Sequence, residues 1–277
     1  MDERRAAMLA EMGVRSWVRP APVEARCLEA AAVPTRVSQP PASRARATVS
    51  AHTAPVAVPV PVRTAPTAAP SASARQRADA GAIATMGWPE LRSEVAHCTA
   101  CRLCEGRSNT VFGVGHEEAH WMVVGEAPGE QEDASGEPFV GKSGQLLDNM
   151  LAAVGLSRTQ GPPQQRVFIA NALKCRPPKD RNPRPEEVEQ CRPFLRRQVA
   201  LVAPRIILAM GRFAVSALLA SDAPIGRLRG RVHDFHGVPT VVTHHPVYLL
   251  RSPADKARAW DDLCLAREIV RAAERAP

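Results

Sequence analysis

The sequence predicts an α/β fold, a three-layer sandwich around a mainly parallel four-stranded central sheet. Three observations predict it. Four short apolar runs recur after residue 120, segments with helical periodicity lie between them, and the first run leads directly into a turn containing Gly and Pro. Strands that alternate with helices are typical of a parallel sheet covered by helices on both faces.

The four expected strands are short and apolar. The first, residues 121–124, enters the turn of "HWMVVGEAPG", as a buried strand followed by a functional loop does. The other three are residues 167–171 ("VFIAN"), 205–210 ("RIILAM") and 238–243 ("VPTVVT"). Ligands of such sheets lie beyond the carboxyl ends of the strands, so we expect the site in the segments that follow these runs.

Helical patterns fill the spaces between the runs. Apolar residues recur every three or four positions in "SGQLLDNMLAAVGL", where Gly155 is a stop signal, and "PEEVEQCRPFLRRQVALVAP" ends at Pro204. A third pattern, "GRFAVSALLA", follows the third run, and residues 254–273 form a long closing helix. These lengths suit helices that cover a sheet.

The composition of the chain changes at about residue 86. Before it, Ala, Pro, Arg, Ser and Thr dominate, and the large apolar residues needed to offset chain entropy are scarce. We expect a short partner-binding peptide over residues 1–19, a disordered Pro/Ala-rich linker over residues 20–86 and one folded domain over residues 87–277.

The formal charge of +8 is concentrated in the first part of the chain. Residues 1–86 hold 11 Lys and Arg against 6 Asp and Glu, which leaves 25 against 22 in the rest. The overall charge is therefore poor evidence for a DNA-binding surface on the folded domain. The N-terminus lacks a signal peptide and no apolar run spans a bilayer, so we expect a cytoplasmic, nucleoid-associated protein with no membrane contact and reduced thiols.

Four of the seven cysteines form two pairs far apart in sequence. Cys98 and Cys101 have C-x-x-C spacing, which lets two thiolates face one ion or cluster from a single turn. A long charged stretch lies between Cys175 and Cys191, and its length fits a cluster-holding loop better than a zinc knuckle. Zinc and ordinary buried thiols stay open as alternatives, and Cys104, in "CTACRLC", leaves the ligand set unforced. Two cysteines have no nearby partner: Cys27 and Cys264.

Three long motifs occur in order: "VVGEAPGEQEDASGEPFVGKSGQLLDNML", "FIANALKCRPPKDRNPRPEEVEQC" and "THHPVYLLRSP". With them the chain closely resembles the family 4 uracil-DNA glycosylases, which carry a [4Fe–4S] cluster, over about residues 91–271. The resemblance implies the glycosylase-type sandwich, hydrolysis of the bond between uracil and deoxyribose, and base excision repair. It also implies four cluster ligands: Cys98, Cys101, Cys175 and Cys191. Cys104 occupies a position that is usually not a ligand in the family.

The resemblance also implies the uracil-binding residues. Phe139 would stack on a uracil rotated out of the DNA, Asn171 would donate to its O4 and accept from its N3–H, and His245 would hydrogen-bond O2 as charge gathers on the departing base. Ala127 stands where other glycosylase families have an aspartate. The alternatives are a core Phe, a turn-capping Asn, and His244 in place of its neighbour.

The carboxylates of "GEAPGEQED" are the candidates for positioning water or supporting the cationic sugar. Glu126 and Glu132 are the candidate catalytic residues, and Asp133 is the third available carboxylate. Because the bond breaks in a largely dissociative manner, stabilising the leaving base matters more than activating the water. The alternative is a solvated acidic loop.

The segment "HHPVYLLRSP" predicts the DNA contact. An apolar wedge in a proline-bounded loop would fill the gap left by the extruded base, and an arginine would reach a phosphate. The alternative is that the leucines cap the core. "RPPKDRNPR" and "GRLRGR" would add phosphate contacts. The candidate DNA-binding residues are Tyr248, Leu249, Leu250 and Arg251.

The N-terminal peptide "MLAEMGVRSWVRP" is similar to the peptide of the psi subunit of bacterial DNA polymerase III that binds the chi subunit. It implies a possible replisome partner through residues 8–20; a frayed helix without a partner is the alternative. We expect a monomer. A different class of function also stays open: a non-catalytic Fe–S or zinc DNA-binding module associated with the replisome. An electron carrier has little support, because the cysteines lack the compact spacing of two-cluster ferredoxins.

Overall fold

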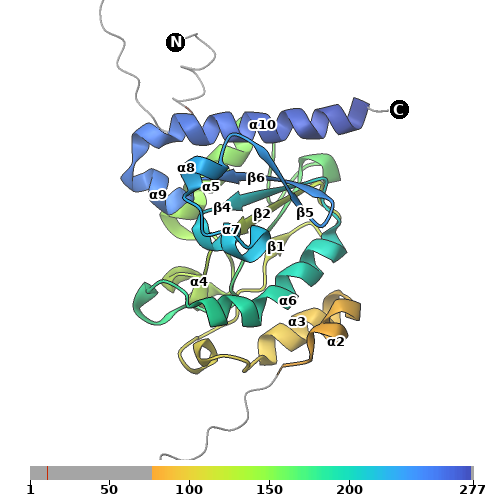
Figure 1. The fold of residues 1–277 in the computed structure, drawn as a ribbon, viewed down its shortest axis with the longest axis vertical. Helices are drawn as coiled ribbons and strands as arrows, with labels where there is room; N and C mark the ends of the chain where they lie inside the picture. Colours follow the sequence, from red (N-terminus) through yellow and green to blue (C-terminus); the bar gives the residue numbers. More distant parts are fainter. Residues whose placement is uncertain (1–10, 12–76, 276–277) are drawn as a thin grey trace, which may run out of the picture. The chain divides into compact units, whose positions relative to one another are not determined.

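The computed structural model describes residue 11 and residues 77–275 (Figure 1). Its single sheet has six strands in the order β1-β3-β2-β4-β6-β5. The peptide predicted over residues 1–19, with its chi-binding resemblance, and most of the linker predicted over residues 20–86 lie outside the described residues.

The four predicted strands form the centre of the sheet, and all of them pair in parallel. Each is an apolar run whose end meets the same edge of the sheet. Their bounds are β2 (Trp121–Gly125), β3 (Val167–Asn171), β4 (Ile206–Met210) and β6 (Val238–Thr243).

The sheet is larger than the predicted four strands. Strand β1 (Val114–Gly115) pairs antiparallel with β3, and β5 (Val232–Phe235) pairs antiparallel with β6. The first is only two residues long, and the second has Val232 about half exposed, so neither shows the apolar run that predicts a buried strand. The architecture is therefore a mixed sheet with a parallel centre and two antiparallel edges.

Helices cover both faces of the sheet, as the sandwich prediction requires. Along β2, Met122 and Val124 face one apolar core while Trp121 and Val123 face the other. The first core packs beneath α2, α3, α6 and α7, and the second beneath α5, α9 and α10, on opposite sides of the sheet in Figure 1. The helix bounds are α2 (Ala80–Thr85), α3 (Trp88–His97), α4 (Glu130–Ser135), α5 (Gly141–Ala153), α6 (Pro185–Val202), α7 (Arg212–Leu219), α8 (Ile225–Leu228), α9 (Pro246–Arg251) and α10 (Lys256–Arg275).

The folded domain begins earlier than residue 87. Helix α2 lies inside the stretch predicted as linker, yet Ile83 is fully buried in the first core and the carboxylate of Asp79 caps the helix. The small residues Ala and Gly that surround Ile83 resemble the linker composition, so one buried side chain carries this contact without a visible apolar pattern. No helix among the described residues is long and apolar enough to cross a membrane.

Candidate active site

A cavity of about 720 Å³ opens at the carboxyl ends of the parallel strands. We call it the strand-end cavity. It is lined by the segments that follow β2, β3, β4 and β6, because parallel strands deliver their ends to one edge of the sheet. The lining includes Glu126, Ala127, Glu132, Phe139, Asn171, Gly211, Arg212, His244, His245, Tyr248 and Arg251.

Phe139 and Asn171 meet above Gly125, the last residue of β2. Both side chains are buried, with exposed fractions of 4% and 3%. A Cβ atom on Gly125 would lie about 2.5 Å from the Phe139 ring and would also collide with Oδ1 of Asn171. The absence of a side chain at Gly125 is therefore what allows the aromatic ring and the amide to share one wall of the cavity.

The backbone of Phe139 is held in an unusual conformation. Its φ of 53° lies in the left-handed region, which a non-glycine residue seldom adopts. Two contacts support it: the guanidinium of Arg158 donates to the carbonyl of Phe139 at 3.2 Å, and Gly144 in α5 lies so close to this carbonyl that a Cβ would clash with it. Strain supported by surrounding contacts is common at ligand sites.

His245 lies at the start of α9 with its ring against Phe139. The two ring centroids are 5.3 Å apart and the planes differ by 26°. Nδ1 of His245 accepts a hydrogen bond from the backbone N–H of Val247 at 3.2 Å, so a neutral ring carries its hydrogen on Nε2. Burial, and then the charge of Arg251, lower the pKa of His245 to about 4, which keeps the imidazole neutral at physiological pH.

His244, the neighbouring histidine, contacts other residues than His245 does. Its ring stacks on Tyr248, with centroids 4.9 Å apart. The Tyr248 hydroxyl donates to Asp255 at 2.7 Å. His244 thus belongs to a cluster between α9 and the start of α10, while His245 stacks with Phe139.

Glu126 caps a helix across the cavity. Its Oε1 accepts the backbone N–H of Phe213 at 3.1 Å, at the start of α7. Gly211, with φ of 93°, passes so close that a Cβ would collide with the carboxylate. Burial raises the pKa of Glu126, and the backbone N–H groups of Phe213 and Arg212 oppose this shift. The carboxylate is thus already engaged by two donors.

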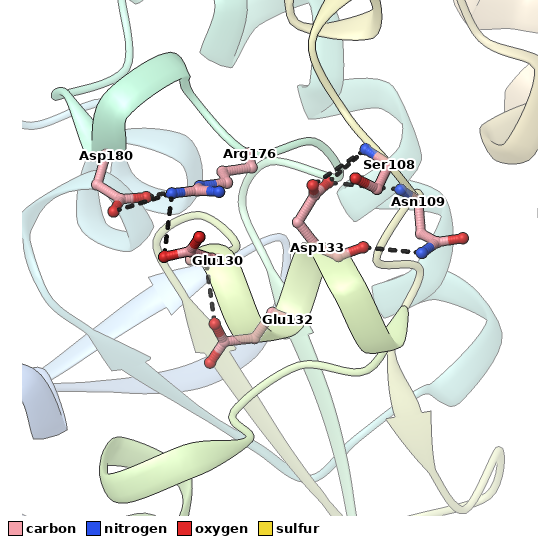
Figure 2. A network of polar contacts seen from close by, with 8 residues as sticks. Ser108, Asn109, Glu130, Glu132, Asp133, Arg176 and Asp180 are labelled. Atoms are coloured by element: carbon pink, nitrogen blue, oxygen red, sulfur yellow. Dashed lines mark hydrogen bonds and ion pairs between the residues drawn. The ribbon is translucent and has the colours of Figure 1, made fainter.

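The other two candidate carboxylates, Glu132 and Asp133, lie in α4, where a loop was the alternative. Oε2 of Glu132 accepts the backbone N–H of Gly129 at 3.1 Å, and Asp133, which is 4% exposed, accepts the N–H of Ser108 at 3.0 Å (Figure 2). Only Glu132 of this pair lines the cavity. Asp133 instead ties α4 to the segment after the first cysteine pair.

The loop after β3 is attached to α4 on the same side. Nε of Arg176 donates to Asp180 at 2.8 Å, and its guanidinium lies 3.8 Å from the carboxylate of Glu130 (Figure 2). Farther along, Arg181 forms two hydrogen bonds with Glu187 at the start of α6, at 2.6 and 2.9 Å. We call the segment between β3 and α6, residues 172–184, the basic loop. These contacts hold it at the rim of the strand-end cavity.

Five thiols line a second, small pocket between α3, the loop after β3 and α6, which we call the thiol pocket. Cys175 and Cys191 are buried, and the other three are partly buried. Desolvation raises the pKa of Cys101 to about 11 and that of Cys191 to about 12. The residues that line the pocket include Cys98, Cys101, Cys104, Cys175, Cys191, Arg107 and Lys174.

Two cations lie beside these thiols. The guanidinium of Arg107 donates to Sγ of Cys175 at 3.1 Å and to the carbonyl of Cys98 at 2.9 Å. Burial lowers the pKa of Lys174 to about 7, and the thiols of Cys191 and Cys175 act in the opposite direction. The pocket therefore combines soft ligands with the positive charge of Arg107 and the amino group of Lys174.

Comparison with known proteins agrees with this geometry. The family model described as the uracil DNA glycosylase superfamily matches residues 112–264. The chain belongs to the uracil-DNA glycosylase superfamily.

Relatives of two types are found among known glycosylases. A type-4 uracil-DNA glycosylase of Archaeoglobus fulgidus is 41% identical over 172 residues, which cover 59% of this chain and 83% of that protein. One of Thermotoga maritima is 41% identical over 172 residues, covering 61% and 86%. A type-5 uracil-DNA glycosylase of Thermus thermophilus is 32% identical over 179 residues, covering 54% and 77%. The predicted family is confirmed.

The structure of this glycosylase domain corrects one of the predicted DNA-binding residues. The predicted wedge is a helix, α9, and Leu249 is fully buried in the second core. Tyr248 and Leu250 are 39% and 43% exposed. Neighbouring side chains of a helix point to different sides, so Leu249 cannot be part of the wedge. For Leu249 the alternative, a leucine that caps the core, is correct. Arg251 lines the cavity.

Two positions of the glycosylase site were missed in the sequence. Gly125 ends a buried strand just before the functional turn, and glycine at such a place signals close approach of another group. Val247 is 41% exposed on α9 beside Tyr248. The flanking prolines favoured a loop here, so its orientation became visible only with the helix.

Proposed function

We propose that this chain removes uracil from DNA by hydrolysing its bond to deoxyribose, which leaves an abasic site and begins base excision repair. One observation carries the proposal: an aromatic ring, an amide and a neutral imidazole converge in the strand-end cavity of a uracil-DNA glycosylase superfamily member. These residues are Phe139, Asn171 and His245.

The cavity acts on an extruded base. A uracil inside a duplex cannot reach a protein pocket, so the nucleotide rotates out of the stack at a cost of a few kcal/mol. Phe139 then offers its ring for stacking, which is the contact that an aromatic base favours. Ala127, which also lines the cavity, leaves room for the base where a larger side chain would intrude.

Asn171 distinguishes uracil from cytosine. Its amide has a donor and an acceptor side by side, which match O4 and N3–H of uracil. Cytosine presents the reverse pattern at these positions. Because the side chain is nearly fully buried and contacts the Gly125 position, its direction is set before the base arrives.

His245 stabilises the departing base. With Nδ1 occupied by the Val247 N–H, its Nε2–H is the donor available to the cavity, and we assign it to uracil O2. Negative charge gathers on this oxygen as the bond breaks, so the hydrogen bond strengthens in the transition state. A neutral donor is sufficient because the bond breaks in a dissociative manner.

The carboxylates play a smaller part. Glu126 accepts two backbone N–H groups, and we assign it to holding the start of α7 at the cavity wall with its negative charge near the developing oxocarbenium ion. Glu132 lines the cavity and is the better placed of the two for water, since it keeps one oxygen outside its contact with Gly129.

The exposed face of α9 engages the DNA. Val247, Tyr248 and Leu250 are large apolar residues exposed by 41%, 39% and 43%, beside the cavity mouth. Such residues suit a wedge that enters the stack where the base has left. Arg251, at the end of the helix, is placed to bind a phosphate.

We propose that Cys98, Cys101, Cys175 and Cys191 hold a [4Fe–4S] cluster. These four thiols line one pocket and come from three segments of the chain. Thiolates are the ligands that hold iron–sulfur clusters, so this donor set fits the cluster.

The cluster would serve as a structural tie. When bound, it supplies covalent links between the segment after α3 and both ends of the basic loop, since Cys175 lies near the start of that loop and Cys191 lies in α6, which follows it. The Arg107 donor to Cys175 is the kind of N–H···S contact that stabilises thiolate ligands.

The test is uracil release from a single-stranded oligonucleotide that contains one uracil, with the same oligonucleotide containing thymine as the control. A glycosylase creates an alkali-labile site at the uracil only. His245→Ala should lose about 10²–10³ in rate while retaining DNA affinity. A gel shift without base release would instead support a non-catalytic DNA-binding module and overturn the proposal.

A further inference from the structure

Lys174 lines the thiol pocket, and its amino group contacts Asn171, a residue that lines the strand-end cavity. Its side chain is 1% exposed, and it is among the largest fully buried side chains of the described residues. It follows Asn171 by three residues and directly precedes Cys175. A lysine in such a place is rare unless its charge has partners.

The amino group of Lys174 has three acceptors. Nζ donates to the carbonyl of Asn171 at 2.9 Å, to Oε1 of Gln198 at 2.6 Å and to the carbonyl of Phe112 at 3.3 Å. An ammonium group has three N–H donors, so all of them are used. The acceptors are themselves fixed, since Gln198 is fully buried and its Nε2 donates to the same Phe112 carbonyl at 2.9 Å.

All three hydrogen-bond acceptors of Lys174 in the described part of the chain are neutral. The ionisable groups that face it are the thiols of Cys191 and Cys175, and the backbone N–H of Lys174 also donates to Cys191.

We propose that Lys174 is a positioning residue for base recognition: its amino group holds the backbone carbonyl of Asn171, and with it the amide that reads the base, against the thiol pocket. The inference deepens the proposed function and rests on it. Asn171 ends β3; beyond it the backbone N–H groups of Ala172 and Leu173 still donate to the carbonyls of Gly125 and Glu126, and the Lys174 contact holds the Asn171 carbonyl in addition. A shift of about 1 Å in a positioning group can cost about a hundredfold in rate.

The experiment compares Lys174→Met with Gln198→Met in the full-length protein. The first keeps an unbranched side chain but removes the donor to Asn171. The second breaks the same network at Gln198 and leaves the contact between Nζ and Asn171 in place. The readout is the Kd of free uracil by calorimetry, with free cytosine as the matched ligand and visible absorbance and iron content recorded for each protein.

Lys174→Met should bind uracil at least about tenfold more weakly, about 1.4 kcal/mol, while Gln198→Met stays within about twofold of wild type. Equal weakening in both variants, or wild-type affinity in Lys174→Met, overturns the proposal. Should Lys174→Met not fold, the same comparison is made with Lys174→Gln, which leaves a polar group in the space but is too short to replace Nζ. Unfolded product from both, beside a folded Gln198→Met, assigns Lys174 a role in stability only and also overturns the proposal.

The two levels of the proposal are distinguishable in the same measurements. A wild-type protein that neither binds free uracil nor releases it from DNA removes the proposed function. A wild-type protein that does both, beside Lys174 variants with unchanged uracil affinity, removes only the role of Lys174.

Discussion

Asn171 and Gly125 are register partners across β3 and β2, and the amide of Asn171 occupies the space where a side chain on Gly125 would stand. Phe139 reaches the same place from the loop before α5. Phe139 and Asn171 can therefore share this wall of the cavity only because Gly125 has no Cβ.

Gly125→Ala should slow uracil release about a hundredfold while leaving a folded protein. The added methyl group displaces the Phe139 ring and the Asn171 amide, and a shift of about 1 Å in such groups costs about a hundredfold in kcat/KM. Steady-state kinetics on a uracil oligonucleotide measures it. Gly226→Ala is the matched control, because a Cβ there meets no atom within 4 Å. Normal kinetics in Gly125→Ala would show that the wall has room for the methyl group.

His245 should give the domain a pH-dependent stability. Its pKa is lowered to about 4 in the fold from the ordinary 6.5, so between these values the unfolded chain binds the proton more tightly. The contribution is complete above pH 6.5 and is lost as the pH falls toward 4. Urea unfolding across this range should show a steeper decline for wild type than for His245→Gln. Parallel pH dependences would mean that the imidazole is solvated in the folded protein.

Leu249 and Leu250 should separate stability from DNA engagement. Leu249→Ala should destabilise the domain by about 2–5 kcal/mol because it leaves a cavity in the second core. Leu250→Ala should destabilise the domain far less than Leu249→Ala, since Leu250 is 43% exposed and lies outside both cores. Leu250→Ala should slow uracil release from duplex DNA more than from single strands, where no gap needs filling. Thermal unfolding and paired kinetics check both; the reverse assignment would contradict the orientation of α9.

Cys191→Ser should yield a colourless and poorly stable protein. Serine cannot replace a thiolate ligand, and the start of α6 would lose its tie to the segment after α3. Iron content and visible absorbance of protein purified without oxygen measure the outcome, and Cys264→Ser, at a cysteine outside the thiol pocket, should keep both. A coloured, stable Cys191→Ser protein would show that another thiol of the pocket, such as Cys104, completes the ligand set.

The parallel centre of the sheet was predictable because β2, β3 and β4 are buried along their whole lengths and β6 over its last four residues, so that each appears as a short, mostly apolar run. The edge strands were not, since β1 is two residues long and β5 is exposed on one side. Helix α2 was missed for a related reason: only Ile83 of its residues is buried. A local pattern reflects burial, and elements with little burial leave little pattern.

Residue types in order along the chain were enough to predict the family and the central strands, which are confirmed, and to nominate the ligand cysteines and the uracil-binding residues, which stay predictions. Directions of side chains were not readable in this way. That Leu249 faces the core while Leu250 faces solvent, that Glu126 caps α7, and that Lys174 lines one pocket and contacts a residue of the other all depend on contacts between segments far apart in sequence. Chemical identity is a property of each residue, whereas orientation is a property of the packing around it.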